Sequence, residues 1–95
     1  MCNEASATQM ISDAKTRVTR FDFAPGAETG WHVHEYDYVI VALTDLTMRL
    51  QLPGGEVREV VTKAGEAYRR DAGTEHNVIN YGDTPMSFIE IELVA

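Results

Sequence analysis

Short apolar runs, rich in Val, Ile, Thr, Phe and Tyr, recur along the chain from Thr8 onward and are divided by turn-forming residues. Side-chain character changes from one residue to the next over residues 18–23 and 88–93, as in Arg20-Phe21-Asp22 and Ile89-Glu90-Ile91. A period of two is typical of strands with two different faces. Residues 38–43 are nearly continuous in apolar character, which favours a central strand covered on both faces. The clearest turn signals are Pro25-Gly26, Pro53-Gly54-Gly55, Asp71-Ala72-Gly73 and Gly82-Asp83. This spacing predicts an all-β sandwich or barrel with almost no helix.

The length of 95 residues predicts one domain over residues 7–95, preceded by a flexible N-terminus over residues 1–6. A chain this short buries only about 60–65% of the surface of its unfolded state, so its stability margin is thin. Association would add buried surface, and we therefore expect a homodimer.

The charge and the apolar fraction exclude several classes of partner. The chain has a formal net charge of -7, whereas nucleic acids and anionic membranes require a positive surface. Its apolar runs are far shorter than the roughly 18–20 residues of a membrane-spanning helix. The first residues lack the basic and apolar regions of a secretory signal, so we expect a cytoplasmic protein with no nucleic-acid or membrane partner.

The chain contains three histidines, and their spacing suits a metal site. His32 and His34 are two residues apart, so on a strand both imidazoles leave the same face. His76 follows a tight turn and begins another β run, so a barrel can bring it opposite the first two. An HxH pair alone is a weak signal, because two unmetallated surface or core histidines share this spacing. Three imidazoles with open coordination positions predict a catalytic rather than a closed structural site.

The residues around the histidines resemble the two sequence motifs of the cupins. The first cupin motif is G(x)5HxH(x)3-4E(x)6G, and its glycine and histidines correspond to Gly26, His32 and His34. The second is G(x)5PxG(x)2H(x)3N, and the matching residues are Gly65, Gly73, His76 and Asn80, with Asp71 in place of the proline. The resemblance spans residues 26–80, with β runs on both sides. It implies the cupin fold, an antiparallel jelly-roll barrel also called a double-stranded β-helix.

The chain departs from the first motif at the position of the usual fourth ligand, where Tyr38 replaces the glutamate. Glu35 and Asp37 are nearby acids, but both lie at odd offsets from His34 and should face the other side of the strand unless a bulge reorients one of them. Tyr38 either places its hydroxyl beside the metal or binds the metal as phenolate. Its ordinary pKa of about 10 disfavours the phenolate, so we favour the first role.

Other side chains are candidates for the pocket. Tyr36 shares the phase of His34 and either borders the pocket mouth or, more commonly for an aromatic residue, packs in the core. Arg70, like Arg69, precedes the second motif and is able to hold a substrate carboxylate, although a solvated or ion-paired arginine is more common. Glu90 and Glu92 share a face of the last strand that is either solvent-exposed or turned into the barrel, and solvent is the favoured interpretation. Trp31 is out of phase with the histidines, so it should lie on the outer surface or at an interface.

The run GWHVHEYDYVIVALTD and the terminal EIEL segment are similar to small stand-alone bacterial cupins, some of which are associated with β-alanine degradation. The resemblance implies one divalent transition metal (Fe, Mn, Ni, Zn or Cu) on the three histidines, with dioxygenase-like or isomerase/lyase chemistry on a small organic metabolite. Three neutral ligands leave the metal its full positive charge, which favours an anionic substrate. The alternatives are a non-catalytic small-molecule binder or sensor, and a structural remnant without metal.

Overall fold

The computed structural model describes residues 3–95, and its regular structure is nine β-strands and one 3-10 turn. The elements are β1 (Ser6–Ser12), β2 (Thr16–Phe23), β3 (His32–Val33), β4 (Asp37–Ala42), β5 (Leu46–Gln51), η1 (Pro53–Gly55), β6 (Val57–Thr62), β7 (Ala67–Arg70), β8 (Glu75–Asn80) and β9 (Met86–Leu93). The all-β prediction is confirmed. Within residues 3–95, no helix has the length and apolar character that crossing a membrane would require.

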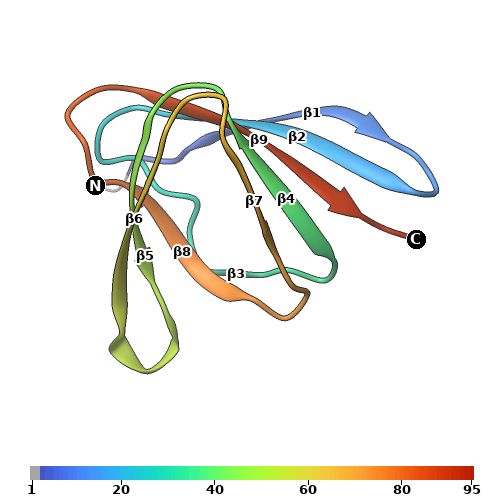
Figure 1. Cartoon of the computed structure of the whole chain (residues 1–95). Coiled ribbons are helices and arrows are strands. Elements are labelled where there is room, and N and C mark those ends of the chain that lie inside the picture. The colour runs from blue at the N-terminus through green and yellow to red at the C-terminus, as the bar shows by residue number, and fades with distance from the viewer. Residues whose placement is uncertain (1–2) are drawn as a thin grey trace.

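The strands form two sheets that enclose the core between them (Figure 1). One sheet has the order β1-β2-β9-β4-β7 and the other the order β3-β8-β5-β6, and every pairing between these strands is antiparallel. Neighbours such as β4 and β9 are far apart in sequence. This arrangement agrees with the predicted cupin double-stranded β-helix.

The core is formed by the inward faces of both sheets. Phe21 and Phe23 of β2 point inward together because they are two residues apart, and the ring of Phe88 on β9 lies 5.4 Å from each of their rings. Leu46 and Met48 of β5 meet them from the other sheet and are almost fully buried. Among these side chains Phe21 is partly buried, and full burial of each of the others contributes roughly 1.5–3 kcal/mol to stability.

The central strand β4 differs from the sequence prediction. It lies between β9 and β7, as a central strand should, but its burial alternates. Tyr38, Ile40 and Ala42 are buried, whereas Val39 and Val41 are only half-buried. The prediction that both faces are covered is therefore wrong, because the other sheet packs against only one face of this sheet. The apolar character of Val39 and Val41 had favoured burial of the outer face as well.

The N-terminal residues that the structure describes join the main body. The amide of Ala5 donates to the Glu28 carbonyl at 2.9 Å, and the amide of Glu28 donates to the Asn3 carbonyl at 2.9 Å. The segment predicted as a flexible N-terminus, residues 1–6, lies partly outside the described residues, because Met1 and Cys2 do not belong to them.

Asn80, the last residue of the second motif, fixes the chain where β8 ends. Its side-chain amide donates to the carbonyls of Phe23, Ala24 and Thr84, and its side-chain oxygen accepts from the amide of Gly82. The side chain is almost fully buried, so these partners replace water. Asn80 thus joins β8 to the ends of two other segments and keeps the strand that carries His76 in place.

Candidate metal centre

Strand pairing brings the first and third histidines together. His32 on β3 lies directly opposite His76 on β8 in the antiparallel register. The segment after β3 stays attached to the turn before β8, because the His34 amide donates to the Thr74 carbonyl at 2.9 Å and the Gly73 amide donates to the His34 carbonyl at 2.8 Å. Gly73 has φ +90°, a conformation that favours glycine and allows this tight turn. The second motif therefore positions His34 as well as His76.

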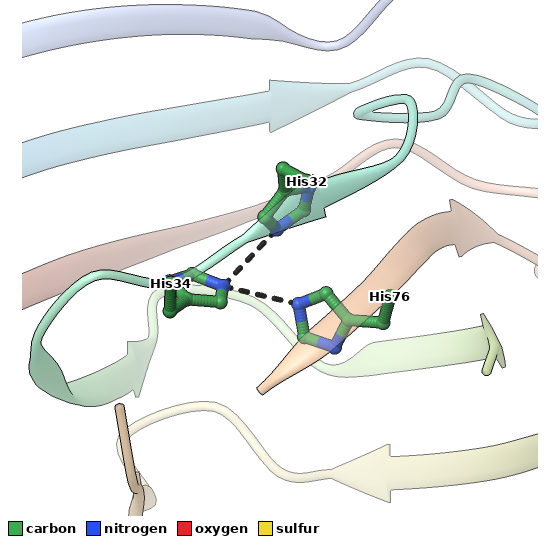
Figure 2. Close-up of side chains that lie close together, drawn as sticks. All are labelled: His32, His34 and His76. Atoms are coloured by element: carbon green, nitrogen blue, oxygen red, sulfur yellow. Dashed lines mark hydrogen bonds between the residues drawn. The ribbon is translucent and has the colours of Figure 1, made fainter. Parts of the chain in front are cut away.

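The three imidazoles point their Nε2 atoms at one another (Figure 2). Nε2 of His34 lies 3.0 Å from Nε2 of His32 and 3.1 Å from Nε2 of His76. His34 and His76 are each 7% exposed, and His32 is half-buried. Metal–nitrogen bonds of about 2.0–2.1 Å that meet at tetrahedral or octahedral angles place ligand nitrogens about 3 Å apart. The spacing therefore fits one transition metal.

The partners of the other ring nitrogens support the same conclusion. Nδ1 of His32 lies 2.9 Å from the Gly30 carbonyl oxygen, which only accepts hydrogen bonds, so Nδ1 carries the proton and Nε2 presents a lone pair. Nδ1 of His34 lies 3.8 Å from a Glu90 carboxylate oxygen, which favours the same tautomer. Two lone pairs then face each other at 3.0 Å, an arrangement that repels without a cation between them. The donor set therefore fits a metal better than a metal-free cluster.

Burial keeps two of the histidines neutral. Loss of solvation lowers the pKa of His34 to about 4, and electrostatic repulsion from His32 makes a smaller contribution. Loss of solvation is also the largest cause for His76, whose pKa falls to about 3, with further contributions from the other two histidines and Arg70. Neutral imidazole is the form that binds a metal, so at neutral pH these ligands need no deprotonation.

Tyr38 supports the His34 ring through packing. The two rings are stacked, with centroids 3.8 Å apart and an interplanar angle of 17°. Tyr38 is 2% exposed, and this burial is the main reason that its pKa is raised above the ordinary value of 10.0. A phenol with a raised pKa resists ionisation, which disfavours Tyr38 as a phenolate ligand.

Glu90 corrects the prediction that its face of the last strand meets solvent. The residue is 9% exposed and points into the barrel beside His34. Loss of solvation, together with the charge of Glu92, raises its pKa to about 7. The sequence contained a signal, because Glu90 shares the strand phase of Phe88, a core residue. Carboxylates are seldom buried, which favoured the solvent interpretation.

The two acids considered as replacements for the missing glutamate lie elsewhere. Asp37 accepts from the Arg69 guanidinium at 2.7 Å and from the amide of Ala72 at 2.8 Å, and Glu35 is exposed. Within residues 3–95, the group of His, Cys, Asp and Glu side chains close enough to hold one metal contains only the three histidines.

The remaining candidates take different positions. Tyr36 is half-buried, and the guanidinium of Arg17 lies 5.5 Å from its ring centroid. Arg70 lines a cavity that Tyr38 and His76 also line. Trp31 is 55% exposed, as its strand phase predicted.

Comparisons with known proteins agree with the fold and the motifs. The family model described as "Cupin domain" matches residues 19–92. The chain is 48% identical over 90 residues to the β-alanine degradation protein BauB of Pseudomonas aeruginosa, covering 95% of this chain and 94% of that protein. A crystal structure of a cupin domain from Bordetella pertussis superposes with a TM-score of 0.95 at 41% identity, covering 100% of this chain and 98% of that one. A Klebsiella pneumoniae protein with a double-stranded β-helix domain has a TM-score of 0.78 at 21% identity, covering 95% and 76% of the two chains. The chain therefore belongs to the cupin family.

Proposed function

We propose that this cupin is a metal-dependent enzyme that acts on a small organic metabolite at His32, His34 and His76. The observation that carries the proposal is the convergence of three Nε2 atoms, with His32 and His34 held by Gly30 and Glu90 as lone-pair donors. The relative at 48% identity is named for β-alanine degradation, which supports a small metabolite as the substrate. Dioxygenase-like cleavage is the first reaction to test, and isomerase or lyase chemistry is the second.

A divalent transition metal bound here would act as a Lewis acid on a substrate oxygen or would activate water or oxygen. The protein holds the imidazoles in orientation through the Gly30 carbonyl, the Glu90 carboxylate and the Tyr38 ring. Apolar side chains, among them Phe21 and Phe88, border the space beside the site and limit the access of water. Three protein ligands would leave at least one coordination position open for substrate, which catalysis requires.

The proposal is tested first by the metal content of untagged protein, because an affinity tag of histidines would bind metal itself. We expect about one metal per chain in the wild type and loss of that metal in His34→Ala and His76→Ala. Val78→Ala is the matched control, since it truncates a buried residue two positions from His76 and leaves all three histidines in place. Wild type that stays metal-free after incubation with Fe(II), Mn(II), Ni(II), Zn(II) and Cu(II) would refute the metal site.

Turnover separates the enzyme from a binder or sensor. Oxygen uptake by the metal-loaded protein is measured with β-alanine and with three-carbon organic acids, alongside detection of products by mass spectrometry. Metal-dependent product formation supports the enzyme, whereas ligand binding without turnover supports the non-catalytic alternative. A homodimer, a cytoplasmic location and the exclusion of nucleic-acid and membrane partners stay predictions of the sequence.

A further inference from the structure

A cavity opens beside the histidines. Its lining includes His76 and Tyr38, whose ring is stacked on His34. It has a volume of about 210 Å³, below the roughly 300–1,000 Å³ of pockets that hold drug-sized molecules. Its polar and aromatic walls are formed by Tyr38, Arg58, Tyr68, Arg70, Thr74 and His76, and three aliphatic side chains complete it. A molecule in this cavity would contact His76, so the cavity leads to the metal site.

The two arginines of β7 face in opposite directions, and only one of them serves the cavity. Arg69 lies on the outer face, where it pairs with Asp37 at 2.7 Å and with Asp71 at 2.9 Å. Arg70 shares the inward phase of Tyr68 and lies opposite Tyr38 in the register of β4 and β7. The alternation of the strand thus places one guanidinium at the cavity.

Arg70 differs from the other arginines in its partners. The chain has six arginines, and within residues 3–95 five of them pair with a carboxylate, whereas Arg70 has none within 4.0 Å. Its guanidinium lies 4.5 Å from the ring centroid of Tyr68 and donates to the Arg69 carbonyl at 2.9 Å. These contacts use part of its donor capacity and hold its orientation. The remaining donors are available to a ligand.

The charge of the side chains that line the cavity is opposite to that of the whole chain. The charged residues that line it are Arg58 and Arg70, and its lining contains no carboxylate residue, although the chain carries 15 acidic residues. Arg58 pairs with Glu56 at 2.9 Å, so its charge is partly balanced, and Arg70 is the stronger attractor. A planar guanidinium recognises carboxylates through two parallel hydrogen bonds.

We infer that this cavity binds a small organic carboxylate, with the carboxylate on Arg70 and the rest of the molecule directed toward His76 and the three Nε2 atoms. The inference rests on the proposed function, since it assigns a charge and a size class to the substrate of that metal site. The volume suits a small organic molecule rather than a drug-sized one, and the aliphatic walls accept its methylene groups.

The test compares propionate with propionamide, which has nearly the same shape and no charge. Binding is followed by NMR chemical shifts of the Tyr68 and Thr74 amides, in metal-free and in metal-loaded protein. We expect propionate to bind at least about tenfold more tightly than propionamide in both forms. Arg70→Gln should weaken propionate binding about tenfold or more, and Arg70→Lys should weaken it less because the charge is kept. Arg20→Gln, on the outer face of β2, is the matched control and should bind as the wild type does.

Several outcomes would overturn the inference. The wild type could bind the two probes equally or fail to bind propionate at all. Arg70→Gln could also bind propionate as tightly as Arg20→Gln does. Tighter Arg70-dependent binding of inorganic phosphate than of propionate would also overturn it, because the site would then be a phosphate site. The metal content of the same samples keeps the two proposals apart. Arg70-dependent binding in metal-free protein supports the cavity even if the metal site fails, and full metal content without such binding refutes the cavity alone.

Discussion

The Glu90 carboxylate lies 3.8 Å from Nδ1 of His34, on an imidazole whose Nε2 faces the other two histidines. The separation is that of a close charge contact rather than a direct hydrogen bond. The family's usual acidic ligand is absent at position 38, and the buried acid of this site comes instead from β9. Glu90 would therefore affect a bound metal indirectly, through the imidazole of His34.

At pH 8, above the Glu90 pKa of about 7, Glu90→Gln should weaken metal binding about 10- to 100-fold, because it removes the negative charge that orients His34 and increases its basicity. Affinity is measured by competition with a chromophoric chelator. Glu92→Gln is the matched control, since Glu92 lies two residues away on the same strand and pairs with Arg17 at 3.3 Å. Equal metal affinity in the two variants would show that Glu90 does not support the site.

The metal-free protein should lose stability on acidification because of His34 and His76. Their pKa values in the folded state, about 4 and about 3, lie below the ordinary 6.5, so the unfolded chain binds more protons between about pH 4 and pH 6.5. Glu90 acts in the opposite sense, because its pKa of about 7 in the folded state exceeds 4.5. The free energy contributed by two histidines outweighs that of one carboxyl, so these groups give a net loss on the order of 1 kcal/mol between pH 7 and pH 5.

Variants separate these opposing contributions. Denaturant unfolding of chelator-treated protein at pH 7 and pH 5 should show a larger loss in Glu90→Gln, which lacks the opposing carboxyl. The loss should disappear in the double variant His34→Ala and His76→Ala. A double variant that loses as much stability as the wild type would mean that the histidines do not cause the pH dependence.

The sequence predicted the parts of the site that depend on local spacing. His32 and His34 share a face because they are two residues apart, and the second motif marks the turn and the strand that carry His76. The second motif also marks Asn80, whose four side-chain hydrogen bonds keep the end of β8 in place. Such features survive in the sequence because residues that are near in the chain determine them.

Features that depend on distant strands could not be predicted with the same certainty. Glu90 lies near His34 because β9 runs between β2 and β4, and strand order is not encoded in any single run. The cavity that joins Arg58 on β6 to Arg70 on β7 is formed by two different sheets. Strand alternation places Arg69 and Arg70 on opposite faces of the sheet. The pairing of β7 with β4 determines that Arg70 lies on the inner face.

Asn80→Ala should lower the free energy of unfolding by about 2–4 kcal/mol. The substitution leaves three carbonyls and the Gly82 amide without their buried side-chain partner. Denaturant unfolding measures the change, and Asn3→Ala, an exposed asparagine, is the control. A loss as small as that of Asn3→Ala would show that water replaces the side chain at no cost.

Tyr38 offers a direct test of whether its ring or its hydroxyl matters to the metal site. Stacking at 3.8 Å on His34 requires only the ring, and burial raises the pKa of the phenol, so the hydroxyl stays protonated. Tyr38→Phe should therefore bind metal within a few-fold of the wild type. Tyr38→Ala should lower the free energy of unfolding by about 3–5 kcal/mol and weaken metal binding, because a cavity replaces the ring that supports His34. Unfolding and chelator competition measure both quantities. A loss of metal in Tyr38→Phe as complete as in His34→Ala would instead identify the hydroxyl oxygen as a ligand.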